Sequence, residues 1–265
     1  MVKTVVVPLD GSDLAETAIG TSRWLAETFH ADLLLFTATF ALDPSEDERY
    51  LHRVIQARDL PRASVEVGAG RSAGPAVVHA RRGSPDSVVC MATHGRTGFR
   101  AAVLGSVADE VVRDMADPVV LVGPSFEPGG GAKELLVCWD GSDVSATIVP
   151  IAAAWAVALD LEPRLLAVRG DGEDPILTDA AGDPLPAVAA MITVLGGGGR
   201  PVELTELVDA DPAEAVAGYA AGNPVALVAM ATQGRSGLAA SALGRVAAKI
   251  VNRCSRPMLV NHPRG

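Results

Sequence analysis

The chain has 265 residues and a mass of 27.2 kDa, close to twice the size of a common domain, which favours two domains of similar size. Hydrophobic residues make up 49% but aromatic residues only 4%, so the core must be built from Ala, Val, Leu and Ile, and this apolar content excludes a disordered chain. The net charge of −10 argues against binding to nucleic acid or to anionic membranes, because both require a cationic surface.

Neither a targeting segment nor a membrane span is expected. The first apolar run meets Asp10 too early for a signal peptide. The longest uncharged stretch, residues 215–234, is interrupted by Gly218, Gly222, Asn223 and Pro224. Three cysteines, odd in number and far apart, fit reduced thiols that act as small core residues in a cytoplasmic protein: Cys90, Cys138 and Cys254.

Two blocks of the sequence are repeated. Val5–Ile19 matches Leu135–Val149 at an offset of 130, and residues 88–124 match 227–263 at an offset of 139, with 15 of 37 pairs identical. Between the copies lies PSFEPGGGAKE, a linker of Pro and Gly. We therefore predict a duplicated domain, with the copies at residues 1–124 and 133–265.

Each copy alternates short apolar runs with helical patterns. In copy one we expect strands at residues 4–9, 31–38, 63–67, 87–92 and 118–122. Between them we expect helices at Asp13–Phe29, Ser45–Arg58, Pro75–Arg82 and Arg100–Ala116. Strict alternation predicts right-handed βαβ crossovers and an open, parallel, doubly wound sheet. With strand order 3-2-1-4-5, a ligand is expected at the carboxyl ends of the first and fourth strands.

Those two strand ends carry polar and glycine-rich segments that recur in the second copy. The first strand ends in Asp10-Gly11-Ser12-Asp13, repeated at Asp140-Gly141-Ser142-Asp143. The fourth is followed by Gly95, Arg96, Gly98, Gly105 and Ser106 before a helical pattern. Glycines let backbone N–H groups approach phosphate oxygens, and a helix N-terminus favours an anion. The loop differs from a P-loop, because no Gly-Lys pair occurs in the chain.

With these motifs, each half resembles a universal stress protein domain, and the chain resembles the tandem, two-domain members common in actinobacteria. The resemblance implies a Rossmann-like fold of the adenine-nucleotide α-hydrolase-like type, a regulatory role in the stress response, and ATP, with which Mg²⁺ could arrive, as ligand. It also implies that the last strands of the two halves pair across a pseudo-two-fold axis, and leaves open whether two chains form a homodimer.

The family's ATP-binding members carry an Asp after the first strand and the loop G-x-x-G-x9-G-[ST] after the fourth. In copy one this pattern falls on Asp10, Ala92, Gly95, Gly105 and Ser106, with Ala92 in place of the first Gly. In copy two it falls on Asp140, Ala231, Gly234, Gly244 and Arg245, where two positions depart from the pattern. The resemblance places the adenine wall at Ala38 and Val168. Nearby candidates for ligand contact are Gly11, Gly141, Arg96, Arg235, Gly98 and Gly237.

Several other interpretations stay open at this point. Asp10 could belong only to a helix cap or an Asx turn, and the glycines only to loop geometry, which would leave a stress-related interaction module without nucleotide. Residues 70–74 match the G-x-S-x-G nucleophile elbow of α/β-hydrolases, which leaves a serine hydrolase using Ser72 as a weaker alternative. Residues 68–73 match a dinucleotide fingerprint, but the second copy has neither motif. The spacing of the Cys and His residues does not suggest a resident metal. The sequence shows no positioned general base, so we expect at most slow ATP hydrolysis and not a dedicated enzyme.

Overall fold

The computed structural model describes residues 2–40, 43–69, 72–84, 86–95, 104–127, 131–197, 199–233 and 242–263. The strands are β1 (Thr4–Pro8), β2 (Asp32–Thr39), β3 (Ala63–Ala69), β4 (Ser87–Ala92), β5 (Val119–Val122), β6 (Glu134–Cys138), β7 (Glu162–Arg169), β8 (Glu203–Val208), β9 (Val225–Ala231) and β10 (Met258–Asn261). The helices are α1 (Asp13–Glu16), α2 (Ala18–Phe29), α3 (Ser45–Arg58), α4 (Ala73–Gly83), α5 (Ser106–Asp114), α6 (Asp143–Ala146), α7 (Val149–Leu159), α8 (Pro186–Leu195), α9 (Pro212–Gly222) and α10 (Arg245–Arg253).

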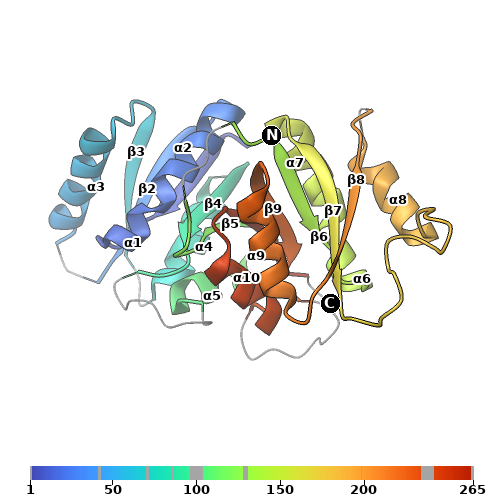
Figure 1. Ribbon diagram of the computed structural model, residues 1–265. Coiled ribbons are helices and arrows are strands. Elements are labelled where there is room, and N and C mark those ends of the chain that lie inside the picture. The colour runs from blue at the N-terminus through green and yellow to red at the C-terminus, as the bar shows by residue number, and fades with distance from the viewer. Residues whose placement is uncertain are drawn as a thin grey trace.

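These strands form one ten-stranded sheet in the order β3-β2-β1-β4-β5-β10-β9-β6-β7-β8 (Figure 1). Each repeat is internally parallel, and its order confirms the predicted 3-2-1-4-5 arrangement of a doubly wound α/β fold. The two halves join where β5 and β10 pair antiparallel, with Val120 opposite Leu259. The expected pairing of the last strands across the repeats is therefore confirmed.

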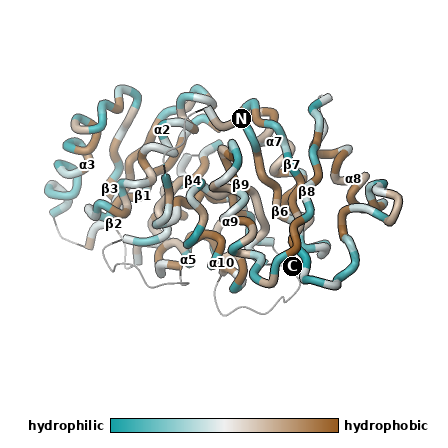
Figure 2. Tube along the Cα trace, in the orientation of Figure 1, coloured by the Kyte–Doolittle hydropathy of each residue, from teal (hydrophilic) through white to brown (hydrophobic). Residues whose placement is uncertain are grey.

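Apolar side chains cover both faces of the sheet, which is why its central strands read as unbroken Val and Leu runs. In β1, Val5 and Val7 enter the core cluster beneath α2, α3, α7 and α8, whereas Val6 enters the cluster beneath α4, α5, α9 and α10. Figure 2 shows the contrast between these buried strands and the mostly hydrophilic α3.

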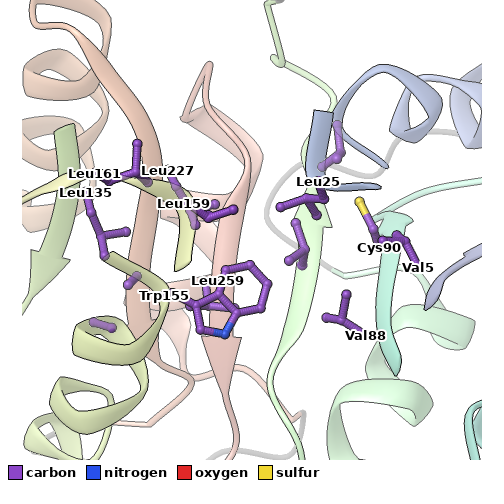
Figure 3. Close-up of a cluster of buried hydrophobic side chains, with 14 of the residues drawn as sticks. Val5, Leu25, Val88, Cys90, Leu135, Trp155, Leu159, Leu161, Leu227 and Leu259 are labelled. Carbon is purple, nitrogen blue, oxygen red and sulfur yellow. The ribbon is translucent and has the colours of Figure 1, made fainter. Parts of the chain in front are cut away.

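The first of these clusters runs through both repeats without interruption. Figure 3 shows Leu25, Val5 and Cys90 of repeat one on one side, and Trp155 beside Leu259 on the other. The ring of Trp155 also meets that of Phe29 edge-on, with centroids 5.4 Å apart and an interplanar angle of 88°. The repeats thus share a continuous core on this face.

Two predicted helices differ from those in the structure. The helix expected over Asp13–Phe29 is divided at Thr17, whose Oγ1 donates to the carbonyl oxygen of Leu14 and so takes a backbone acceptor from the helix. Within the described residues, the helix expected from Arg100 begins only at Ser106. Gly105 before it is extended, because its N–H donates to the Thr93 carbonyl oxygen rather than to a preceding helical turn.

The described cysteines are free thiols, and Cys90 and Cys254 are buried. Burial raises the pKa of Cys90 and of Cys138 to about 12, so neither thiol ionises near neutral pH. They pack as small apolar side chains. Among the described helices, none is both long and apolar enough to span a lipid bilayer.

Repeat two contains a partly buried polar network at the start of β6 and in β7 that repeat one lacks. Arg164 Nε donates to Glu134 Oε2 at 2.8 Å, and its guanidinium carbon lies 5.8 Å from the ring centroid of Tyr219. The Glu134 side chain is only 10% exposed. The strand register and the repeat offset place Thr4, Leu34 and Ala80 at the corresponding positions of repeat one.

Removal of Arg164 should therefore destabilise the protein strongly. We expect Arg164→Leu to lower the free energy of unfolding by about 3 kcal/mol, because the Glu134 carboxylate stays buried without its counter-ion. The matched triple variant Glu134→Thr, Arg164→Leu, Tyr219→Ala copies repeat one and should recover most of that loss. Urea unfolding followed by circular dichroism measures both, and equal stability of Arg164→Leu and wild type would contradict the network's role.

The junction between repeats gives a second prediction. A Cβ added at Gly123 would collide with the carbonyl oxygen of Val251, whereas one added at Gly218 in α9 would meet no atom within 4 Å. We expect Gly123→Ala to destabilise the protein by about 1–3 kcal/mol and Gly218→Ala to stabilise it by about 0.5–1 kcal/mol, since alanine favours a helix. Effects of the same sign in urea unfolding would contradict this account of the junction.

Candidate functional site

The turn after β1 is built around the Asp10 carboxylate. Asp10 Oδ1 accepts hydrogen bonds from Ser12 N at 3.0 Å and from Ser12 Oγ at 2.6 Å. Ser12, rather than Asp10, is the N-cap of α1, and its Oγ accepts from Ala15 N. Gly11 between them has φ +81°, a conformation that other residues rarely adopt. One oxygen of Asp10 thus holds the turn.

The other carboxylate oxygen of Asp10 faces the segment after β4. A Cβ on Gly95 would collide with Asp10 Oδ2, so a larger residue there would require the Asp10 side chain to move. The next described glycine, Gly105, donates its N–H to the Thr93 carbonyl oxygen at 2.9 Å, and a Cβ there would lie 2.6 Å from that oxygen. Both glycines of the predicted motif are therefore required by contacts within the protein itself.

A cavity of about 610 Å³ opens beside this arrangement in repeat one. It brings together the carboxyl ends of β1, β2 and β4 with the first turns of α4 and α5. Six of the sequence-predicted residues line it: Asp10, Ala38, Ala92, Gly95, Gly105 and Ser106. The first-strand and fourth-strand ends thus meet where the strand order predicts a ligand. Arg96 and Gly98 lie outside the described residues.

The N-terminus of α5 forms one wall of the cavity through Ser106, Val107 and Ala108. Gly105 is its N-cap and makes no side-chain capping bond. A helix start of this kind favours an anion, because its first N–H groups have no partner within the helix. The described lining contains two carboxylates, Asp10 and Asp47, and neither Lys nor Arg.

The opposite half of the cavity is apolar, and the sequence analysis did not single out its residues. Phe36, Val77 and Met91 are almost fully buried there, and Phe40 stands at the rim. Gly68 is explained by this wall, since a Cβ on it would lie 2.5 Å from Phe36 Cζ. The sequence held one clue to this apolar wall. Because β2 neighbours β1 in a parallel sheet, the segment FTATF, residues 36–40, was expected to end beside Asp10.

Ser72, the serine of the nucleophile-elbow match, also lines the cavity. Its hydroxyl donates to Glu110 Oε2 at 2.8 Å. A serine nucleophile normally passes its proton to an imidazole, so a carboxylate partner does not form the expected dyad. His94, on the other side of the cavity, has its Nδ1 2.9 Å from Thr93 Oγ1, a local hydrogen bond.

In repeat two, a second serine lies beside the aspartate that follows the first strand. Asp140 Oδ1 lies within hydrogen-bonding distance of Ser142 N, Ser142 Oγ and Ser145 Oγ, the two hydroxyls at 2.6 Å each. Repeat one has Ala15, a cavity-lining residue, where repeat two has Ser145. Asp140 therefore has a hydroxyl partner at a position where repeat one carries the methyl group of Ala15.

Two other predicted residues of repeat two, Arg245 and Val168, differ from their counterparts in repeat one. Gly244 donates its N–H to the Thr232 carbonyl oxygen at 2.7 Å, as Gly105 does to Thr93, but Arg245 opens α10 where Ser106 opens α5. Val168 adds bulk at the Ala38 position. Of the remaining candidates, Gly141 has φ +87° and Ala231 is buried, whereas Gly234, Arg235 and Gly237 lie outside the described residues.

An anchored strap follows β7 in repeat two, and we define it as residues 170–177. Arg169 Nε pairs with Glu206 Oε1 at 2.7 Å. Glu206 Oε2 accepts hydrogen bonds from Ile176 N and Leu177 N, and Leu177 is 1% exposed. The strap is thus fixed across the carboxyl ends of β7 and β8. The sequence of this segment gave no sign of the anchoring.

Comparison with known proteins agrees with this architecture. The chain is similar to a universal stress protein from Archaeoglobus fulgidus, with 18% identity, a TM-score of 0.67 and 97% of each chain covered. It is also similar to a functionally unknown protein from Pseudomonas aeruginosa, with 13% identity, a TM-score of 0.63, and 99% and 93% of the two chains covered. These likenesses show the fold, and no curated protein gives a significant match.

The family model supplies the assignment itself. The model of the universal stress protein family matches residues 1–123 and again residues 131–262, which together make up nearly the whole chain. The chain therefore belongs to the universal stress protein family and carries two copies of its domain in tandem.

Proposed function

We propose that repeat one binds ATP or a related adenine nucleotide, and that the protein acts in regulation rather than as a dedicated enzyme. The observation that carries this proposal is the cavity at the switch point, where Asp10, Gly105 and Ser106 meet the N-terminus of α5. Its volume of about 610 Å³ lies in the usual range for a small-molecule site.

The lining suggests how such a ligand would be divided between the two halves of the cavity. The α5 N-terminus and the Ser106 hydroxyl suit phosphate oxygens, whereas the end of β2 near Ala38 suits a base. Asp10 is suited to accept hydrogen bonds from ribose hydroxyls. The resemblance to ATP-binding members supports the same division. The acidic lining means that the phosphate charge must be balanced by the helix terminus, by Arg96 or by an accompanying Mg²⁺.

We further propose that the chain binds one nucleotide rather than two. In repeat two, Ser145 occupies Asp140, Val168 narrows the base position, and Arg245 replaces the serine hydroxyl. A bound nucleotide can then serve as a signal only through a difference in affinity between two conformations of the protein.

The second candidate function is that of an interaction module that binds no nucleotide. It is favoured by the fact that Gly95 and Gly105 are already required by Asp10 and Thr93.

Titration calorimetry with ATP separates the two candidates. We expect saturable binding with a stoichiometry of one, abolished by Asp10→Ala and unchanged by Asp140→Ala. The two substitutions remove equivalent carboxylates, each of which holds the turn after the first strand of its repeat. Each should therefore lower the free energy of unfolding by about 1–2 kcal/mol, and only Asp10→Ala should affect ligand binding. Absence of saturable binding at millimolar ATP, or loss of binding in Asp140→Ala, would contradict the proposal.

The difference between Ala15 and Ser145 gives an independent prediction. Ala15→Ser should weaken ATP binding about fivefold or more, because a hydroxyl placed as in repeat two would compete for Asp10 Oδ1. The reciprocal change, Ser145→Ala, is the control and should leave the dissociation constant for ATP unchanged. If Ala15→Ser binds ATP as tightly as wild type, occupation of the aspartate is not what distinguishes the repeats.

A further inference from the structure

Phe40 is an aromatic residue in an unusual position. Its exposed fraction is 68%, whereas the other large exposed hydrophobic residues of the described chain are valines at 39–54%. It directly follows the end of β2 and lines the rim of the repeat-one cavity. An exposed aromatic ring does not contribute the stabilisation that its burial would give. Its position at a cavity rim therefore suggests a role other than packing.

The fold itself does not require this ring. The neighbouring phenylalanine, Phe36, is 1% exposed and packs its ring tip against Gly68, so that ring belongs to the core. Strand registers align the position after β2 with Gly170 after β7, where the chain enters the anchored strap. An aromatic side chain is therefore present in the repeat with the open cavity, and the smallest residue is present in the repeat with the strap.

The cavity beneath Phe40 has two chemically different halves. Phe36 of β2, Val77 of α4 and Met91 of β4 contribute apolar side chains from one core cluster. Asp10, Gly105 and Ser106 form the polar side near β1 and α5. A ligand that fills both halves must carry a flat apolar group at one end and an oxygen-rich group at the other. Phe40 stands on the wall formed by the end of β2, with Ala38.

We propose that Phe40 is the stacking platform for the base of the bound nucleotide, and so selects ligands that carry a planar heteroaromatic ring. This inference rests on the proposed nucleotide binding and adds a residue and a selectivity to it. Ring stacking uses the exposed face of Phe40, which the bound base would cover. Stacking of a base on an aromatic side chain typically changes affinity by about 5- to 100-fold when the ring is removed.

The test compares aromatic with aliphatic replacements at this position by calorimetric titration of ATP. Phe40→Trp keeps a stacking face and should retain the wild-type dissociation constant to within about threefold, whereas Phe40→Leu keeps apolar volume only and should weaken binding about tenfold. Val157→Ala, which removes apolar surface on α7 away from the cavity, is the control for non-specific effects and should change nothing.

Two further readouts make the result specific to the base. Ribose 5-triphosphate, which lacks a base, should bind wild type and Phe40→Leu equally, and nuclear Overhauser effects should connect the Phe40 ring protons with adenine H2 or H8. If wild type binds ATP and Phe40→Leu binds it as tightly, the stacking role is overturned while nucleotide binding stands. If wild type binds no ATP, the proposed function fails first, and the stacking role fails with it.

Discussion

The antiparallel pairing of β5 with β10 is the contact on which the rest of the molecule depends. Each repeat alone would end in a short apolar strand, Val119–Val122 or Met258–Asn261, with an unpaired edge open to other chains. Pairing the two edges removes that liability and makes one sheet from two. The approach is close enough that Gly123 lies directly against the Val251 carbonyl oxygen. The Phe29 and Trp155 rings then close the junction on one face.

The same junction links the candidate site to the second repeat. The first turn of α5 lines the repeat-one cavity, and Asp109, three residues after Ser106, accepts a hydrogen bond at 2.7 Å from the backbone N–H of Ala242 in repeat two. The repeat offset places Ala248 at the position of Asp109, so repeat two has no carboxylate with which to return the contact. The duplicated halves are therefore joined asymmetrically at the helix that faces the proposed ligand.

Apolar periodicity and repetition predicted the duplicated α/β domains, and with the strand order 3-2-1-4-5 they placed Asp10 beside the glycine segment. The pairing of the repeats through their last strands was implied by the family resemblance. The sequence showed that repeat two departs from the motif at Arg245, but it did not predict the side-chain contacts that also distinguish the repeats. Ser145 in place of Ala15 is a one-atom difference whose meaning depends on the carboxylate beside it. The Arg169–Glu206 pair joins residues 37 apart on two neighbouring strands, and a charged residue near the end of a strand ordinarily suggests only a solvated surface. Side-chain contacts between residues distant in sequence cannot be predicted from the pattern of residue types in a single sequence.

The glycines show why the motif and the ligand have to be argued separately. Gly95 lies close to Asp10 Oδ2, and Gly105 lies close to the Thr93 carbonyl oxygen. Gly244 makes the equivalent backbone contact in repeat two, where Ser145 donates a hydrogen bond to the aspartate. A glycine thus precedes both α5 and α10, and in each repeat its N–H donates to the carbonyl oxygen of the threonine that follows the fourth strand. What differs is the surface that this packing leaves open. Repeat one presents a carboxylate, a helix start and an exposed ring around one cavity, and the proposed nucleotide binding rests on that combination.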